Sequence, residues 1–150
     1  MFLSTHEKQL DAKRRLLVPQ EFRAAAAQPF SDIEAFSGVY CFALKSQACL
    51  ECGGPQFFDR YKRLIEAEPF ASPKRRLLEQ HIYGGMTRLN FDPAGRITLP
   101  ESVCEAYGIR DRAVLLGLSD RFQVWAPEAY AAEVAKKEAE NAALFAELGI

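Results

Sequence analysis

A short element that occurs twice, 81 positions apart, constrains the fold of this chain more than any other feature. The copies are LDAKRRLLVP at 10–19 and FDPAGRITLP at 91–100. Each copy has an Asp, an Arg four positions later and a Pro four positions after that, with apolar residues at matching positions between them. A turn, a short strand and a helix start that are repeated in this way predict two structurally equivalent halves.

The elements around this repeat recur in the same order. Strand candidates at 2–10 and 82–91 enter the turns, and short strands at 15–18 and 96–99 leave them, so a β-hairpin is the simplest expectation in each half. A helix that begins with Pro follows, then two strands and a second Pro-led helix, the last of which is expected to run to residue 149. Each half is thus predicted as strand, strand, helix, strand, strand, helix.

The halves are expected to meet at a linking helix, for which Ser72 is the N-cap and Pro73 lies in the first turn. This predicts an α+β chain with three parts. The first unit covers 1–70, the linking helix covers 71–82, and the second unit covers 83–150 and ends in a C-terminal helix.

Charge is unevenly distributed along a chain whose net charge is only -1. Lys and Arg outnumber Asp and Glu by five to three in residues 1–23 and by seven to three in residues 60–88, whereas acids outnumber bases by six to three in residues 120–150. This pattern excludes a protein that coats nucleic acid with its whole surface, and it predicts a basic face and a separate acidic tail helix. The sequence has no apolar run that would span a membrane and no signal peptide, so we expect a cytoplasmic protein whose four cysteines are reduced.

The two turns have the chemistry of anion-binding sites. In the second copy, the Asp92 carboxylate can accept a hydrogen bond from the backbone two residues on, and Gly95 can adopt a positive φ, so a stiff turn holds Arg96 in a fixed place. An arginine fork binds phosphate or a guanine edge through two hydrogen bonds. In the first copy Arg14 replaces the Gly, so either its backbone is left-handed, at a cost of about 1–2 kcal/mol, or the turn type differs. The competing interpretation is that each Asp only bridges its own turn, Asp11 to Arg15 and Asp92 to Arg96.

The Met-Phe-Leu start, LDAKRRLLVPQEFR, FDPAGRITLPESV and DRFQVWAPEAY together resemble the bacterial MraZ family, whose two tandem units belong to the SpoVT-AbrB swapped-hairpin class. The resemblance covers nearly the whole chain, from Met1 to about Tyr130. It implies a pseudo-two-fold β-barrel with flanking helices, in which one chain supplies both halves of a fold that single-unit relatives build by dimerising. It also implies a nucleoid-associated transcriptional repressor of the division and cell-wall gene cluster. Such a protein binds short direct repeats in double-stranded DNA ahead of its own operon, as a closed homo-oligomeric ring, commonly an octamer.

Carried over by position, the resemblance assigns the DNA-facing residues. They are Lys13, Arg14 and Arg15 in the first unit, Arg96 in the second and, on the strand that enters the second turn, Arg88; Asp11, Asp92 and Gly95 form the turns. The family usually has Gly where this chain has Arg14. Because Ala94 stands in the second turn where Lys13 stands in the first, we expect the first turn to dominate phosphate contact. Several copies on one ring face would raise the affinity of a weak, salt-sensitive contact.

Two other classes of function remain open from the sequence. Single-unit swapped-hairpin proteins also act as antitoxins that bind a protein partner, but those are typically short and have a disordered tail. An enzyme is the second alternative, and we expect no catalytic residue, metal or cofactor. Cys49 and Cys52 have a C-x-x-C spacing without a second pair of ligands, which favours core thiols over a zinc site, and no nucleophile motif accompanies His6 or His81. The cations at 74–76 are interpreted as a solvated helix face, with a second DNA patch or a contact with a neighbour's acidic tail helix as alternatives.

Overall fold

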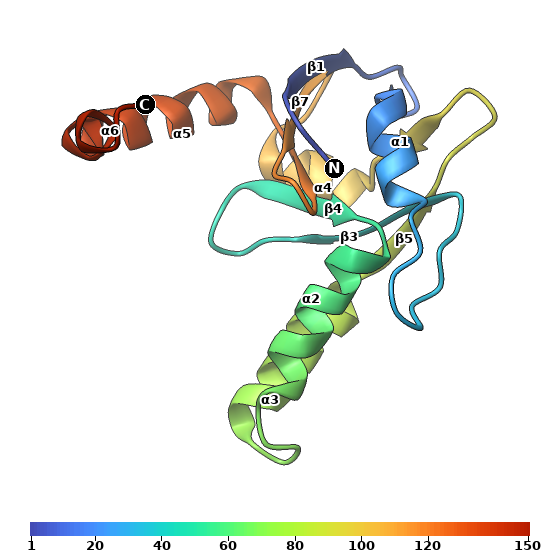
Figure 1. Cartoon of the computed structure of the whole chain (residues 1–150). Coiled ribbons are helices and arrows are strands. Elements are labelled where there is room, and N and C mark those ends of the chain that lie inside the picture. Colours follow the sequence, from blue (N-terminus) through green and yellow to red (C-terminus); the bar gives the residue numbers. More distant parts are fainter.

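The computed structural model describes residues 1–150 and builds them around one six-stranded sheet and a separate two-stranded ribbon (Figure 1). The strand order of the large sheet is β1-β7-β8-β4-β3-β5, and every neighbouring pair in it is antiparallel. The ribbon consists of β2 and β6, also antiparallel. The strands are β1 (Thr5–Gln9), β2 (Arg15–Leu17), β3 (Gly38–Ala43), β4 (Cys49–Gly53), β5 (Thr87–Asn90), β6 (Arg96–Thr98), β7 (Arg112–Gly117) and β8 (Phe122–Trp125).

The two halves of the chain exchange strands. The first strand of the first half, β1, pairs with β7 of the second half, and β5 of the second half pairs with β3 of the first. The centre of the sheet, β4 with β8, and the ribbon also join one half to the other. The strand order is unchanged when each strand is replaced by its counterpart in the other half, as the sequence repeat predicts.

The predicted hairpins are wrong, because β1 does not pair with β2 and β5 does not pair with β6. The reason lies in the apolar residues after each turn: Leu16, Val18, Ile97 and Leu99 are all fully buried. A hairpin partner at the edge of the sheet would leave such residues partly in water, whereas the ribbon lays them on the core. The strand ladder is open, with β1 and β5 at its two edges, so it does not form the closed barrel expected from the resemblance.

Helices follow the predicted order in each half. They are α1 (Gln20–Ala26), α2 (Pro55–Glu66), α3 (Pro73–Leu78), a π-helical turn η1 (Glu79–Tyr83), α4 (Glu101–Tyr107), α5 (Pro127–Glu140) and α6 (Ala142–Leu148). Helix α3 and η1 lie where the linking helix was expected, and the Ser72 hydroxyl accepts a hydrogen bond from the Arg75 amide at 3.1 Å. Pro19 and Pro100 lie at the N-cap position of α1 and α4, not inside the first turn, with extended ψ angles of 143° and 135°.

The single C-terminal helix expected at 127–149 is wrong, because the helix breaks at Asn141. The backbone of Asn141 has φ -123° and ψ 20°, and its side-chain amide donates to the Lys137 carbonyl at 2.8 Å. Asn competes for backbone hydrogen bonds in this way, which explains a break inside a sequence of good helix formers.

Buried side chains cover both faces of the sheet. The main core lies between the sheet, the ribbon, α1 and α4, and includes a cluster of the rings of Phe2, Phe22 and Phe122. A second cluster lies under α2 and η1 around Phe42 and Phe57. All four cysteines are free and buried. Cys52 belongs to the main core and Cys49 to a third cluster with Val114 and Trp125, which confirms the prediction of core thiols.

Two helical segments project from this body in different directions (Figure 1). We call α5 and α6 the arm, and α2, α3 and η1 the leg. Neither segment, nor any other helix, is long and apolar enough to cross a membrane.

Candidate nucleic-acid interface

The first Asp turn, residues 11–15, is closed by backbone and side-chain hydrogen bonds. The Arg14 amide donates to the Asp11 carbonyl at 3.0 Å, and the Asp11 amide donates to the Arg15 carbonyl at 3.1 Å. One carboxylate oxygen of Asp11 accepts from the amides of Lys13 and Arg15, both at 2.9 Å. The other oxygen accepts from Nε of Arg15 at 2.6 Å. The turn therefore fixes the arginine side chain through the same carboxylate that fixes the backbone.

The second Asp turn, residues 92–96, repeats this geometry. One oxygen of Asp92 accepts from the amides of Ala94 and Arg96 at 3.0 and 2.9 Å, and the other accepts from Nε of Arg96 at 2.7 Å. The hydrogen bond to Ala94 is the bond predicted two residues on. Gly95 has a φ of +87°, and Arg14, at the matching place in the first turn, has a φ of +63°, which selects the left-handed alternative for that residue.

Each turn lowers the pKa of its Asp. The pKa of Asp11 is lowered mainly by the backbone hydrogen bond from Arg15, and the pKa of Asp92 is lowered mainly by the one from Arg96. The ion pairs with the same arginines add to both shifts. These contacts show that each Asp bridges to the Arg of its own turn. They leave an external role open, because no hydrogen bond within the chain uses the terminal Nη atoms of Arg15 or Arg96.

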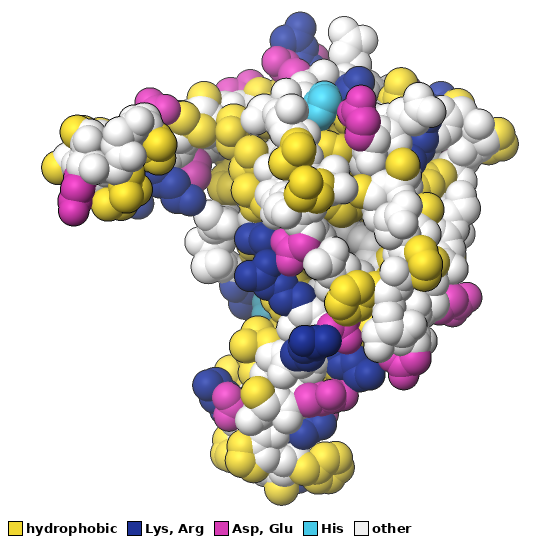
Figure 2. Space-filling view, in the orientation of Figure 1, with side chains coloured by type: hydrophobic (Ala, Val, Ile, Leu, Met, Phe, Trp, Pro, Cys, Tyr) yellow, Lys and Arg dark blue, Asp and Glu magenta, His cyan; other side chains and the backbone are white.

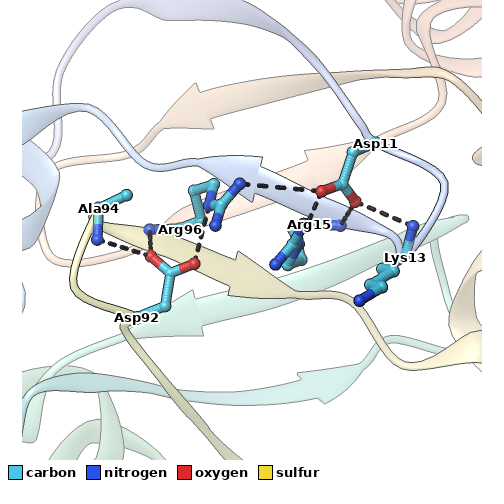
Figure 3. A network of polar contacts seen from close by, with 6 residues as sticks. All are labelled: Asp11, Lys13, Arg15, Asp92, Ala94 and Arg96. Atoms are coloured by element: carbon cyan, nitrogen blue, oxygen red, sulfur yellow. Dashed lines mark hydrogen bonds and ion pairs between the residues drawn. The ribbon is translucent and has the colours of Figure 1, made fainter.

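The ribbon places the two turns at its opposite ends, with the side chains of Arg15 and Arg96 between them (Figure 3). In its register Arg15 lies opposite Thr98, and Leu17 lies opposite Arg96. The Arg96 guanidinium also lies 3.8 Å from the Asp11 carboxylate, so it bridges both turns. One face of the ribbon is buried, and the other presents Arg15, Leu17, Arg96 and Thr98. About a third of each arginine side chain is exposed, so this outer face is a surface that carries two oriented guanidinium groups.

Sequence reasoning missed a second arginine pair that stabilises the ribbon from behind. Nη1 of Arg23, in α1, donates to the Val18 carbonyl at 2.6 Å. At the matching carbonyl of the other half, Leu99, the donor is Nε of Arg14 at 3.1 Å. In the repeat register Arg23 corresponds to Cys104, which cannot supply this bond.

The replacement of Gly by Arg14 in the first turn therefore has a structural reason. In one half, Gly leaves room for the Arg23 guanidinium: a β-carbon at Gly95 would lie 2.4 Å from its Nη1. In the other half, Arg14 itself provides the guanidinium, and Cys104 is small. The exchange of Gly95 and Arg23 for Arg14 and Cys104 is visible in the sequence once the two copies are aligned.

The remaining candidates lie in different surroundings. Lys13 is exposed at the tip of the first turn and forms no ion pair. Arg88 is not part of the ribbon. Its guanidinium forms an ion pair with Glu34 at 3.0 Å and lies over the rings of Phe36 and Tyr40, beside a surface cavity of about 590 Å³.

The histidines occupy packed positions away from the turn arginines. His6 packs edge-to-face on Phe22, and His81 packs on Phe42. Neither ring has an adjacent nucleophile among these contacts. The structure therefore brings Lys13, Arg15 and Arg96 together with both Asp residues, places Arg14 behind them, and places Arg88 elsewhere.

Comparison with known proteins agrees with the repeat. The family model described as "MraZ protein, putative antitoxin-like" matches residues 1–80 and 82–148. The protein called "Transcriptional regulator MraZ" of Caulobacter vibrioides (strain NA1000 / CB15N) is 50% identical over 137 residues, which cover 91% of this chain and 84% of that one. The protein of the same name in Phenylobacterium zucineum (strain HLK1) is 55% identical over 130 residues, which cover 87% and 78%. A third relative of that name, in Rhizobium johnstonii, is 32% identical over 140 residues, which cover 93% of each chain. The chain belongs to the MraZ family.

Proposed function

We propose that this chain is a transcriptional regulator that binds double-stranded DNA with the outer face of the β2–β6 ribbon and its two Asp turns. The observation that carries the proposal is the pair of guanidinium groups of Arg15 and Arg96, each held by a carboxylate through Nε. Their Nη atoms donate no hydrogen bond within the chain, although Nη1 of Arg96 lies 3.8 Å from the Asp11 carboxylate. A two-stranded ribbon fits the major groove of B-DNA, where an arginine can read guanine through two hydrogen bonds. The names of the relatives, transcriptional regulators, agree with this use.

Within this proposal the five cations have different roles. Lys13 contacts phosphate, and Arg15 and Arg96 contact phosphate or base edges. Arg14 adds charge beside them while its Nε stabilises the ribbon, and Arg88 makes a peripheral contact with the DNA backbone. Because Arg96 is shared between two carboxylates and Lys13 stands only in the first turn, we expect the first turn to contribute more to affinity.

The proposal extends to assembly and target. The exchanged strands support a swapped-hairpin fold of the SpoVT-AbrB class, made of units at 1–70 and 83–150 that are joined by the helix at 71–82. The protein forms a homo-oligomeric ring, an octamer, and acts at the nucleoid in the cytoplasm. It represses the division and cell-wall gene cluster by binding short direct repeats upstream of its own operon. A ring that presents several ribbons on one face engages successive repeats, which raises affinity without new contacts.

The test is a titration of a fluorescently labelled duplex that carries tandem repeats from the region upstream of the protein's own gene, with a scrambled duplex for comparison. We expect tighter binding to the repeats, a loss of about 1–3 kcal/mol for Arg15→Ala, and a smaller loss for Arg96→Ala. Arg63→Ala is the matched control, since Arg63 forms an i,i+4 ion pair with Asp59 at 2.8 Å on the leg.

Two results would contradict the proposal. Equal affinity for the repeats and the scrambled duplex would show that the protein does not recognise the repeat sequence. If the variants of Arg15 and Arg96 bind DNA as tightly as Arg63→Ala does, the ribbon is not the DNA-binding surface. A chain that ignores DNA and instead forms a stable complex with another protein of the cell would favour the antitoxin-like alternative.

A further inference from the structure

The arm leaves apolar side chains in solvent. Neither α5 nor α6 has a buried residue. Near the C-terminus, Leu144, Leu148 and Ile150 are 47%, 61% and 81% exposed. Several large apolar side chains exposed together on a projecting segment are characteristic of an interaction surface.

A groove separates the arm from the sheet that it leaves. Its volume is about 440 Å³. Apolar side chains from the sheet and from the arm line it: Leu116, Leu118, Trp125, Tyr130, Val134 and Phe145. Hydrogen bonds fix the floor, since the Trp125 indole donates to the Gln123 side chain at 2.9 Å, and Gln123 donates to the buried Glu51 carboxylate at 2.8 Å. The groove is therefore preformed in the single chain.

The end of the leg has the opposite shape, an exposed apolar projection. Phe70 is 80% exposed and Leu77 is 65% exposed. Figure 2 shows hydrophobic side chains gathered at this end of the molecule, together with Lys and Arg side chains along the leg. Lys74 and Arg75 form ion pairs within the leg, with Glu68 and Glu79, whereas the exposed Arg76 forms none.

The two surfaces also differ in charge. Residues 127–150, which include the arm, contain five Glu and two Lys, whereas residues 55–83, which form the leg, contain six Lys or Arg and four Asp or Glu. Glu138 lies at the groove and forms no ion pair within the chain. One chain thus carries both a groove with a partly apolar lining beside the acidic arm and an exposed apolar projection with a cation that forms no ion pair.

We propose that the leg of one copy docks into the groove between the arm and the sheet of the next copy. Phe70 and Leu77 enter the groove, and Arg76 approaches Glu138. The contact is heterologous, because the leg and the groove are different surfaces of one chain, so every added copy leaves one of each free until a ring closes. This inference rests on the proposed ring and identifies the surfaces that build it.

The exposed apolar side chains at the end of the leg favour this occupant over DNA. Five of the six leg cations lie within 4.0 Å of a carboxylate of their own chain, and Arg76 is the sixth. A contact with phosphate would leave Phe70 in water. A second copy of the chain satisfies both the apolar projection and the single free cation.

The experiment measures mass by size-exclusion chromatography with light scattering. We expect Phe70→Ser/Leu77→Ser, the leg variant, and Val134→Arg, the groove variant, each to reduce the particle to the mass of one chain, 16.8 kDa. All three positions are at the surface or half-buried, so the variants should fold, and circular dichroism is the check that they do. The two variants mixed in equal amounts are expected to form dimers and nothing larger, since each retains the surface that the other has lost.

A charge exchange tests the polar contact separately. Arg76→Glu and Glu138→Arg are each expected to weaken the assembly, and the double variant is expected to restore it. Arg110→Glu, at an exposed arginine that forms no ion pair, is the charge-matched control and should leave the mass unchanged.

The outcomes distinguish this inference from the proposed function. Variants that keep the wild-type mass, or a mixture that forms no dimer, would overturn the docking of the leg in the groove while leaving DNA binding intact. A wild-type protein that is itself a single chain in solution would overturn the proposed ring together with this inference.

Discussion

Substitution of Gly95 tests how the ribbon is stabilised. A β-carbon there would meet the guanidinium of Arg23 at 2.4 Å, and it would have to accept a φ of +87°. Left-handed backbone costs a non-Gly residue about 1–2 kcal/mol. Displacement of the guanidinium would also break the 2.6 Å hydrogen bond from Arg23 to the Val18 carbonyl, and such charged bonds contribute about 1.5–3 kcal/mol. Gly95→Ala should therefore destabilise the fold by about 2.5–5 kcal/mol.

A double-mutant cycle separates the two contributions. Arg23→Ala alone should cost about 1.5–3 kcal/mol, because it removes only the hydrogen bond. In that background Gly95→Ala should cost only the backbone strain of about 1–2 kcal/mol. The double variant should thus be about as stable as Gly95→Ala alone, with a coupling of about 1.5–3 kcal/mol between the two positions.

The assay is urea unfolding followed by circular dichroism. Protomer concentration has to be the same for all four proteins, because assembly raises the apparent stability of an oligomer. Effects that add to within about 0.5 kcal/mol would refute the reasoning, since they would show that Arg23 moves aside without losing its bond to Val18.

Gly54→Ala should destabilise the protein by about 1–3 kcal/mol in the same urea assay, because its β-carbon would lie 2.5 Å from the Ala26 carbonyl oxygen. Gly84→Ala is the control and should be nearly neutral, since a β-carbon there would have nothing within 4 Å. Equal losses of stability in the two variants would contradict this prediction. Burial raises the pKa of Cys49 to about 12, so the native protein should react with a thiol reagent at pH 8 far more slowly than the unfolded protein, in which all four cysteines react. The pKa values of Asp11 and Asp92 are lowered in the folded protein, so these residues stabilise the fold above the usual Asp pKa of about 3.9. That stabilisation is lost as the pH falls through the lower pKa of the folded state. NMR titrations of the two carboxyl carbons with midpoints at or above the usual value would disprove the hydrogen-bonded turns.

The local elements could be predicted from the sequence because their signals are short-range. The Asp carboxylate, the positive φ of Gly95 and the N-cap at Ser72 each depend on residues within five positions, and all three are confirmed. Burial of Trp125 and Cys52 also follows from their strands, since apolar runs of this length are typical of core strands.

Strand pairing could not be predicted in the same way. The hairpin prediction considered each half alone, whereas β1 pairs with β7, which lies more than 100 residues later in the chain. The ribbon likewise joins residues about 80 positions apart, and no local pattern distinguishes this exchange from a hairpin. The cost of bringing such distant segments together grows only slowly with their separation, so burial of Leu16 and Ile97 decides the pairing.

The candidate site was predicted in part for a related reason. Both turns and their arginines were identified from the repeat, but the role of Arg14 depends on Leu99 and on the absence of an arginine at position 104. Arg88 was included among the DNA-facing residues by the resemblance, on the strand that enters the second turn. In the sheet it lies opposite Tyr40, and its side chain contacts Glu34 instead.

The salt dependence of DNA affinity tests the central claim most directly. For the wild type, log K for the repeat duplex should fall steeply and linearly with log salt, with a slope of about -0.9 for every phosphate contact. Lys13→Ala combined with Arg15→Ala should bind more weakly at every salt concentration and with a shallower slope, because Lys13 is assigned to phosphate and Arg15 to phosphate or a base edge. Arg63→Ala should retain both the affinity and the slope. A slope that is the same for all three proteins would contradict the assignment of the ribbon as the DNA-binding surface.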